Sequence, residues 1–153
     1  GTGCGYQAAV LSQLAKEVLT IERRPELASA ALEKLARLGC HNVHVHCGDG
    51  TLGLPDFAPF DAILVAAAAP AAPEPLLAQL AEGSRMIIPV GDVDNQELRL
   101  IEKKSGAYST RVLEGCRFVP LVGYHGWQDW FIGTTTRRRA SCCCSMPKAK
   151  TTS

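Results

Sequence analysis

The stretch Gly1-Thr2-Gly3-Cys4-Gly5-Tyr6 decides how the rest of the chain is arranged. Its three glycines stand directly before the helix-forming run 7–11, which predicts a tight loop that leads into a helix N-terminus. Glycine lets a backbone approach a ligand closely, and the start of a helix offers unpaired N–H groups with a partial positive charge. The loop alone is weak evidence for a site, because glycine-rich turns are common.

Two acidic residues strengthen the indication of a ligand site. Glu22 ends the strand-like run 18–22, and a carboxylate at this spacing can accept hydrogen bonds from both hydroxyls of a ribose. Asp49 stands between Gly48 and Gly50, after the next apolar run, although it could be only a turn residue. The loop and the two acids together predict a site for an adenosine-containing cofactor at the carboxyl ends of neighbouring strands.

Predicted helices and strands alternate along the chain. Helices are expected at 7–15, 25–38 and 73–80, and strands at 18–22, 43–47, 61–66 and 85–90. In the first helix Ala8, Leu11 and Leu14 form one apolar stripe, and the strand at 61–66 is apolar enough to be covered on both faces. Apolar runs around residues 103–106 then predict a hairpin. This order predicts an α/β fold with a doubly wound, mostly parallel sheet and antiparallel strands at the C-terminal end.

These motifs together resemble the protein-L-isoaspartate (D-aspartate) O-methyltransferase family. The matching segments are 1–11, 21–23, 42–45, 48–53, 60–65, 67–70, 88–91, 96–98 and 117–123. The resemblance covers about residues 1–127 in order, and it implies a Rossmann-like S-adenosylmethionine-dependent methyltransferase domain.

The resemblance also implies roles for individual residues, and S-adenosyl-L-methionine as the cofactor. The implied cofactor-binding residues are Gly1, Thr2, Gly3, Gly5, Tyr6, Glu22, Arg23, Gly48, Asp49 and Gly50. Glu22 would contact the ribose, and Asp49 with Gly50 the adenine end. The implied substrate-binding residues are Ala67, Ala68, Leu121 and Val122. The spacing alone does not exclude NAD as the cofactor, since Gly3, Gly5 and Ala8 also fit a dinucleotide-binding fingerprint. The resemblance to the family is what favours S-adenosylmethionine.

The implied reaction moves a methyl group to the free carboxylate of an L-isoaspartyl residue in a damaged protein, which is a repair reaction. That carboxylate is already ionised at neutral pH, so alignment matters more than a strong base, and no metal is required. In the family a serine or threonine of an N-terminal region lies at the reaction centre, and that region has no counterpart here. The sequence therefore identifies no catalytic residue.

The strand that should precede the glycine loop is also absent, and it should lie between the strands at 18–22 and 61–66. We expect an N-terminally truncated chain that lacks its first strand and is only marginally stable, because unpaired buried backbone groups are costly. Two alternatives to an active methyltransferase stay open. One is an inactive fragment or a cofactor-binding or regulatory module, and the other is an NAD-linked oxidoreductase.

The composition limits the domain count, the partners and the cellular location that we expect for this chain. The 153 residues suffice for one domain, expected at 1–127, followed by a tail at 128–153 without periodicity that we expect to be disordered. A net charge of +1 argues against a nucleic-acid partner. We find no apolar run long enough to span a membrane and no signal peptide. Seven cysteines, three of them adjacent at 142–144, predict reduced thiols in the cytoplasm. We expect a monomer.

The segment 40–47 raises the question of a zinc site. Strand alternation places His44 and His46 on one face, between Cys40 and Cys47. Neither a CxxC nor an HxxxH spacing is present, so histidines without a metal are the favoured interpretation. Cys4 is interpreted as a small loop residue.

Overall fold

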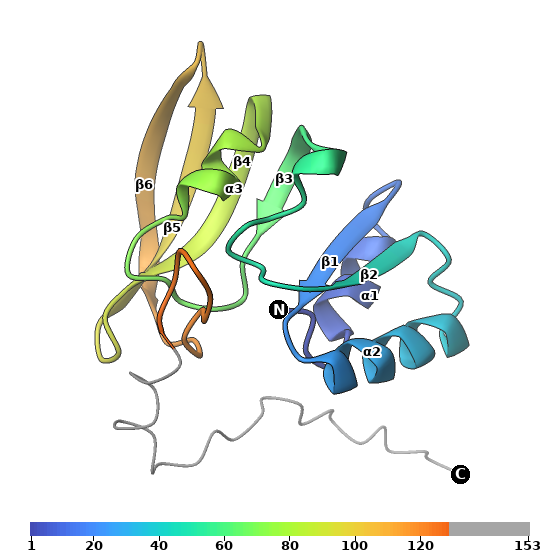
Figure 1. Cartoon of the computed structure of the whole chain (residues 1–153). Helices are drawn as coiled ribbons and strands as arrows, with labels where there is room; N and C mark the ends of the chain where they lie inside the picture. The colour runs from blue at the N-terminus through green and yellow to red at the C-terminus, as the bar shows by residue number, and fades with distance from the viewer. Residues whose placement is uncertain (129–153) are drawn as a thin grey trace, which may run out of the picture.

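The computed structural model describes residues 1–128, so the expected tail lies outside the described residues except for Gln128. Figure 1 shows helices and strands alternating in the first part of the chain and a strand meander after them. The elements are α1 (Tyr6–Ser12), β1 (Val18–Glu22), α2 (Pro25–Arg37), β2 (Val43–Cys47), the short 3₁₀ helix η1 (Pro55–Phe57), β3 (Phe60–Leu64), α3 (Glu74–Ala78), β4 (Leu80–Gly91), β5 (Gln96–Lys104) and β6 (Ala107–Cys116).

The first part of the chain packs two helices against a parallel pair of strands. β1 and β2 pair from Val18 opposite Val43 to Glu22 opposite Cys47. Pro25 opens α2 and Glu26 lies in its first turn, a sequence that suits a helix N-terminus. Helices and strands share one small core. It consists of Ala8, Val18, Leu35, Cys40 and Val43. Both strands have the predicted bounds.

The second part is a mixed sheet in the order β3-β4-β5-β6. β3 pairs with β4 in parallel, and β4, β5 and β6 then pair antiparallel, with the β5–β6 turn at Ser105 and Gly106. The predicted hairpin and antiparallel C-terminal end are therefore confirmed. A second hydrophobic cluster covers this sheet. Its buried members are Ala67, Ala69, Leu76, Leu80, Met86, Ile88, Val90, Ile101 and Leu121.

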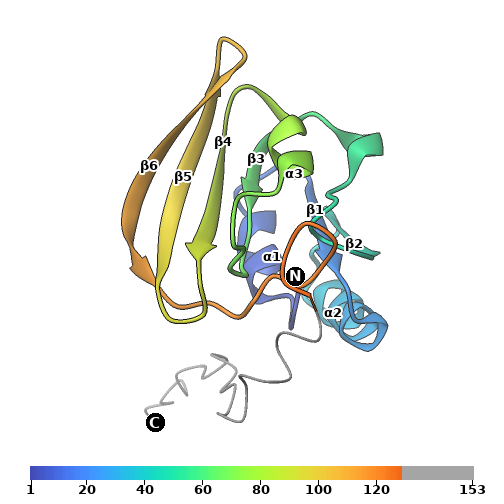
Figure 2. The ribbon, with the colours of Figure 1, turned by 60° about the vertical axis from the view of Figure 1, so that its left-hand side comes forward.

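Within residues 1–128 the α/β sheet is divided into two parts. The two-stranded β1–β2 sheet and the four-stranded sheet are separate, with β1 and β3 as neighbours across the division (Figures 1 and 2). The division lies where the sequence predicts a missing strand. Each part keeps its own hydrophobic cluster, whereas a domain of this size usually has one continuous core.

Four expectations about local structure are wrong. α1 ends at Ser12, so Leu14 lies beyond the helix and its side chain is 79% exposed. α3 covers only Glu74–Ala78. β4 begins at Leu80 and not at the expected residue 85, because Leu80 already pairs with Phe60 of β3 before a shift in register. β3 is not covered on both faces, since Leu64 is 44% exposed beside the division of the sheet.

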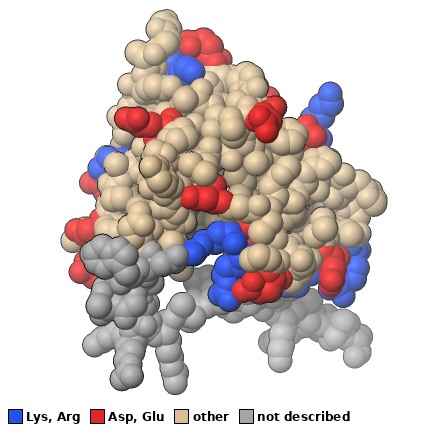
Figure 3. Space-filling model, in the orientation of Figure 1, with Lys and Arg blue, Asp and Glu red and all other residues tan. Residues whose placement is uncertain are grey.

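Charged side chains of both signs are dispersed over the face of the molecule drawn in Figure 3. Among the described helices, none has the length and apolar character needed to cross a membrane.

Candidate functional site

The glycine loop rests on the carboxyl end of β1. The Thr2 N–H donates to the Ile21 carbonyl at 2.9 Å, and the hydroxyl oxygens of Thr2 and Thr20 lie 2.8 Å apart. Gly3 and Gly5 have φ angles of 55° and 87°, which residues with a side chain rarely adopt. Gly5 is the residue before α1, so the predicted loop leads into the predicted helix. Glycine is therefore required by the backbone conformation at two of the three positions.

The Glu22 carboxylate holds this loop in place. Its Oε2 accepts a bond from the Gly3 N–H at 2.9 Å, and its Oε1 accepts one from the Arg24 N–H at 3.1 Å. The side chain is 5% exposed, and a Cβ built on Gly1 would lie 2.6 Å from Oε2. Gly1 is therefore glycine because of its close approach to Glu22. A carboxylate has about four acceptor positions, so Glu22 keeps capacity for further donors.

Asp49 ties the loop after β2 to the C-terminal segment 123–125. Its Oδ1 accepts bonds from the Thr51 N–H at 2.8 Å and the Thr51 hydroxyl at 2.7 Å, and its Oδ2 accepts one from the Tyr124 N–H at 2.7 Å. Burial alone would raise the pKa of Asp49. The hydrogen bonds from Tyr124 and Thr51 and the charge of Arg23 outweigh burial and lower the pKa.

Three glycines of these loops have open space where a side chain would begin. A Cβ built on Gly3, Gly48 or Gly50 would meet no atom of residues 1–128 within 4 Å, apart from its chain neighbours. At Gly48 and Gly50 the backbone conformation does not require glycine either, since their φ angles are not positive. The absence of a side chain there leaves the loop backbone open to a molecule outside it. Tyr6, directly after the glycine loop, is 66% exposed.

The predicted substrate-binding residues come together in the second part of the chain. The Ala68 N–H donates to the Val119 carbonyl and the Leu121 N–H donates to the Ala68 carbonyl, both at 2.8 Å. Trp127 Nε1 also donates to the Ala68 carbonyl, at 3.0 Å. Ala67, Ala68 and Leu121 are buried, and Val122, which is partly buried, forms a bridge with Trp127. The loop 66–69, which consists of four alanines, is thus joined to segment 118–122 by hydrogen bonds.

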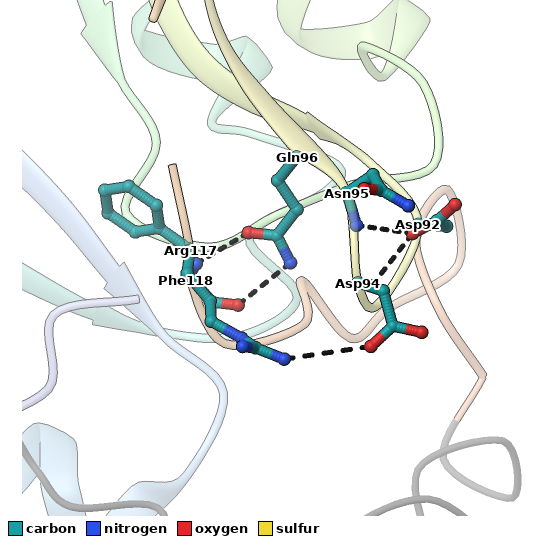
Figure 4. A network of polar contacts seen from close by, with 6 residues as sticks. All are labelled: Asp92, Asp94, Asn95, Gln96, Arg117 and Phe118. Carbon is teal, nitrogen blue, oxygen red and sulfur yellow. Dashed lines mark hydrogen bonds and ion pairs between the residues drawn. The ribbon is translucent and has the colours of Figure 1, made fainter. Parts of the chain in front are cut away.

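A buried glutamine holds segment 118–122 against the start of β5 (Figure 4). Gln96 Oε1 accepts from the Phe118 N–H at 2.6 Å, and Gln96 Nε2 donates to the Phe118 carbonyl at 3.1 Å. Beside it, Asp92 accepts bonds from the N–H groups of Asp94 and Asn95, and Arg117 lies 3.7 Å from Asp94. The Gln96 amide therefore fixes the backbone of segment 118–122, which contains two of the predicted substrate-binding residues.

Comparison with known proteins identifies the family. The family model described as protein-L-isoaspartate(D-aspartate) O-methyltransferase matches residues 1–126. The chain belongs to this family. Protein-L-isoaspartate O-methyltransferase 1 of Syntrophobacter fumaroxidans is 56% identical over 128 residues, which cover 84% of this chain and 60% of the relative. The protein-L-isoaspartate O-methyltransferase of Trichlorobacter lovleyi is 54% identical over 129 residues, which cover 84% of this chain and 59% of the relative.

Solved structures of the same family share the fold. A protein-L-isoaspartate O-methyltransferase superimposes with a TM-score of 0.77 at 34% identity, covering 82% of this chain and 41% of its own. A Plasmodium falciparum structure described as a protein-L-isoaspartate O-methyltransferase in complex with S-adenosyl-L-homocysteine gives a TM-score of 0.68 at 29% identity, with 80% and 63% covered. The sequence-based prediction of family and fold class is thus confirmed. This chain spans about 60% of the length of the curated relatives named above.

The structure places the ten predicted cofactor-binding residues of this family member around the carboxyl ends of β1 and β2. Two residues that support them were not predicted. Thr20 meets the Thr2 hydroxyl, and Thr51 bonds Asp49. The position of Thr51 two residues after an aspartate in a turn could have indicated its role, because Asp side chains commonly accept from the backbone two residues on.

The histidines of β2 lie away from these loops. His44 Nε2 is 3.2 Å from Glu17, and the His46 ring contacts the Phe57 ring with centroids 5.2 Å apart. Among residues 1–128 no three His, Cys, Asp or Glu side chains gather closely enough to hold a metal ion. The zinc hypothesis gains no support from the described part of the chain.

Proposed function

We propose that this chain binds S-adenosyl-L-methionine and carries the cofactor half of a protein repair methyltransferase that acts on L-isoaspartyl residues. One observation carries the proposal. In a chain of this family, Glu22 fixes the glycine loop through the Gly3 N–H, and a Cβ built on Gly48 or Gly50 beside Asp49 would meet nothing within 4 Å in the described part of the chain. The two loops follow neighbouring parallel strands, the usual place for a nucleotide-type ligand in such sheets.

The residues present fit the cofactor. Glu22 would accept from the ribose hydroxyls with the lone pairs that Gly3 and Arg24 leave unused. Gly48, Asp49 and Gly50 would border the adenine end, and Gly1, Thr2, Gly3, Gly5 and Tyr6 would follow the rest of the molecule, with Arg23 beside Asp49. Bound S-adenosylmethionine supplies a methyl group on a sulfonium, which passes to a carboxylate oxygen as the carbon–sulfur bond breaks, giving a methyl ester and a thioether without transfer of a proton.

Ala67, Ala68, Leu121 and Val122 would form the wall against which the substrate peptide lies. Their side chains are apolar, and the Ala68 backbone is bonded to Leu121 and Val119, so these groups would offer little competition for a substrate carboxylate. These residues would orient the isoaspartyl carboxylate and exclude water. The carboxylate is already ionised and the methyl group is already activated on the sulfonium, so their alignment is the main requirement of the reaction.

The partner in this proposal is an exposed isoaspartyl segment of a damaged protein or peptide. We further propose a monomer in the cytoplasm that binds neither nucleic acid nor a membrane. Among residues 1–128, Cys40, Cys47 and Cys116 are free thiols, which suits a reducing compartment. The near-neutral net charge of +1 suits the absence of a polyanionic partner.

Calorimetric titration with S-adenosylhomocysteine tests the cofactor proposal, with NAD as the competing ligand. We expect saturable binding of S-adenosylhomocysteine alone. Glu22→Gln should weaken binding by about tenfold or more, since one lost charge-assisted bond is worth roughly 1.4 kcal/mol or more. Glu26→Gln is the matched control, because Glu26 lies on the exposed start of α2 and pairs with Arg24. Binding of NAD, or equal affinities for the two variants, would contradict the proposal.

Transfer itself is tested with radiolabelled S-adenosylmethionine and two peptides that differ only in an isoaspartyl or an aspartyl linkage. Label in the isoaspartyl peptide alone supports a repair enzyme. Cofactor binding without transfer to either peptide would favour a cofactor-binding module.

A further inference from the structure

The buried glutamine Gln79 belongs neither to the glycine loop nor to segment 118–122. It stands directly after α3, and it is 7% exposed. Its backbone is held by its own bonds, because its N–H donates to the Pro75 carbonyl at 3.3 Å and its carbonyl accepts from the Phe60 N–H at 2.8 Å. The side-chain amide is therefore not needed to hold its own segment.

The Gln79 amide is bonded to the far end of the loop that begins at Asp49. Its Oε1 accepts from the Leu54 N–H and its Nε2 donates to the Leu52 carbonyl, both at 2.8 Å. The two backbone groups are of opposite kind, so the amide fits them in one orientation only. A buried amide that makes both bonds to one short segment fixes the path of that segment, since breaking the bonds would leave polar groups without partners.

Gly53, between the two bonded residues, shows how closely the amide approaches the loop. Its φ angle is 68°, and a Cβ built on it would overlap the Gln79 amide. The Gly53 N–H donates to the Gly50 carbonyl at 3.3 Å, and the Leu52 N–H donates to the Asp49 carbonyl at 3.2 Å. The amide therefore restrains a compact turn that begins with the two residues proposed to meet the adenine end.

We propose that Gln79 is a positioning residue for the base of the cofactor. By holding the turn 49–54, it fixes the orientation in which Asp49 and Gly50 meet an adenine ring. The inference rests on the proposed function, because it takes an S-adenosyl ligand as the occupant of the site. Gln79 acts through the loop backbone, so its effect should appear in the choice between bases.

The loop has the means to distinguish bases. Within residues 1–128 the Asp49 carboxylate accepts three hydrogen bonds, from Thr51 and Tyr124. A carboxylate has about four acceptor positions, so Asp49 can accept from a further donor such as the amino group of adenine. Hypoxanthine has a carbonyl oxygen in place of that amino group. A site built to bond one group rejects the analogue that lacks it, provided that the loop is held in place.

Calorimetric titration with S-adenosylhomocysteine and S-inosylhomocysteine, which differ only in the base, tests the proposal. We expect the wild type to prefer the adenine ligand by about tenfold or more. Gln79→Met keeps the length of the side chain without the amide and should reduce this preference by about threefold or more. Gln96→Met is the matched control, because Gln96 is also 7% exposed and makes both its bonds to one backbone segment. This control should lose stability and keep the preference.

The possible outcomes separate this inference from the proposed function. A merely structural role of Gln79 would lower the affinity for both ligands by the same factor, so an unchanged ratio in Gln79→Met would overturn the inference. Equal binding of the two ligands by the wild type would also overturn it, and would leave cofactor binding intact. A wild type that binds neither ligand would contradict the proposed function, and the inference with it.

Amide hydrogen exchange without any ligand tests whether Gln79 holds the turn. The Leu54 amide should exchange about tenfold faster or more in Gln79→Met and should be unchanged in Gln96→Met. Equal exchange at Leu54 in the wild type and Gln79→Met would overturn the proposal. Gln79→Glu keeps an oxygen for the Leu54 N–H and loses only the donor to Leu52, so its base preference should fall by less. If Gln79→Met does not fold, Gln79→Glu decides, and a base preference equal to that of the wild type would overturn the proposal.

Discussion

The Asp49 carboxylate accepts a hydrogen bond from the Tyr124 N–H at 2.7 Å across 75 positions of sequence. The Thr51 hydroxyl accepts a bond from the His125 N–H at 3.1 Å beside it. These two bonds fasten the C-terminal segment 123–125 to the loop after β2. They hold together two segments that are far apart in the sequence, beside the candidate cofactor residues Gly48 and Gly50.

Asp49→Ala should release this segment. The variant loses three hydrogen bonds to the half-buried carboxylate and should lower the free energy of unfolding by about 1–3 kcal/mol. Chemical denaturation measures the loss, and faster exchange of the Tyr124 amide locates it. Asp56→Ala is the control, since Asp56 is exposed at η1. Unchanged exchange at Tyr124 would show that the bond contributes little in solution.

The contribution of Asp49 should depend on pH in the acid range. The pKa of Asp49 is lowered in the folded chain, so its stabilising effect is fully present above the unfolded pKa of about 3.9 and is lost as pH falls through the lower folded value. The stability difference between the wild type and Asp49→Asn should therefore be constant from pH 7 to pH 5 and shrink below about pH 4. Urea titrations at each pH measure it, and a difference that grows in acid would contradict the assignment.

Gly123→Ala should be destabilising because the added methyl group has no room. A methyl group at residue 123 would overlap the Asp49 carboxylate. Segment 123–125 or the loop around Asp49 must therefore move, at a cost of about 1–3 kcal/mol in stability. Gly115→Ala is a matched control, because a Cβ at Gly115 would meet no atom within 4 Å. The two variants should differ in Tm by several degrees, and equal values would mean that the contact relaxes without cost.

Gln96→Ala should disturb segment 118–122 more than the fold as a whole. The buried amide makes both of its bonds to the Phe118 backbone, and their loss leaves a polar pair without partners, costing about 1–3 kcal/mol. Hydrogen exchange should accelerate at Phe118. Glu97→Ala serves as control, since Glu97 is exposed and pairs with Arg99. Similar exchange at Phe118 in the two variants would exclude a positioning role for Gln96.

Local patterns predicted much of the fold. β1 and β2 have the expected bounds because each is a short apolar run between turn or capping residues, and Pro25 marks the start of α2 as expected. The glycine loop and Glu22 were predicted to act together, and the structure joins them through the Gly3 N–H.

Features that depend on distant partners were not predictable. β4 begins at Leu80 because β3 lies beside it, whereas its own sequence at Glu82 and Gly83 indicates a turn. The burial of β3 was overestimated. An apolar sequence shows that a strand can be buried on both faces, but whether other elements cover those faces depends on the fold. The Gln96 amide and the Asp49–Tyr124 bond leave no periodic pattern in the sequence.

The bond between Asp49 and Tyr124 has a consequence for the order of events during synthesis. The ribosome must add 75 more residues after Asp49 before the partner of its carboxylate exists, which takes roughly 4–15 seconds at ~5–20 residues per second. Until then the carboxylate has the bonds from Thr51 and the charge of Arg23 but lacks the bond from Tyr124. The loop around Asp49, which is the candidate contact of the adenine, therefore lacks one of its hydrogen bonds until nearly all of residues 1–128 have been synthesised.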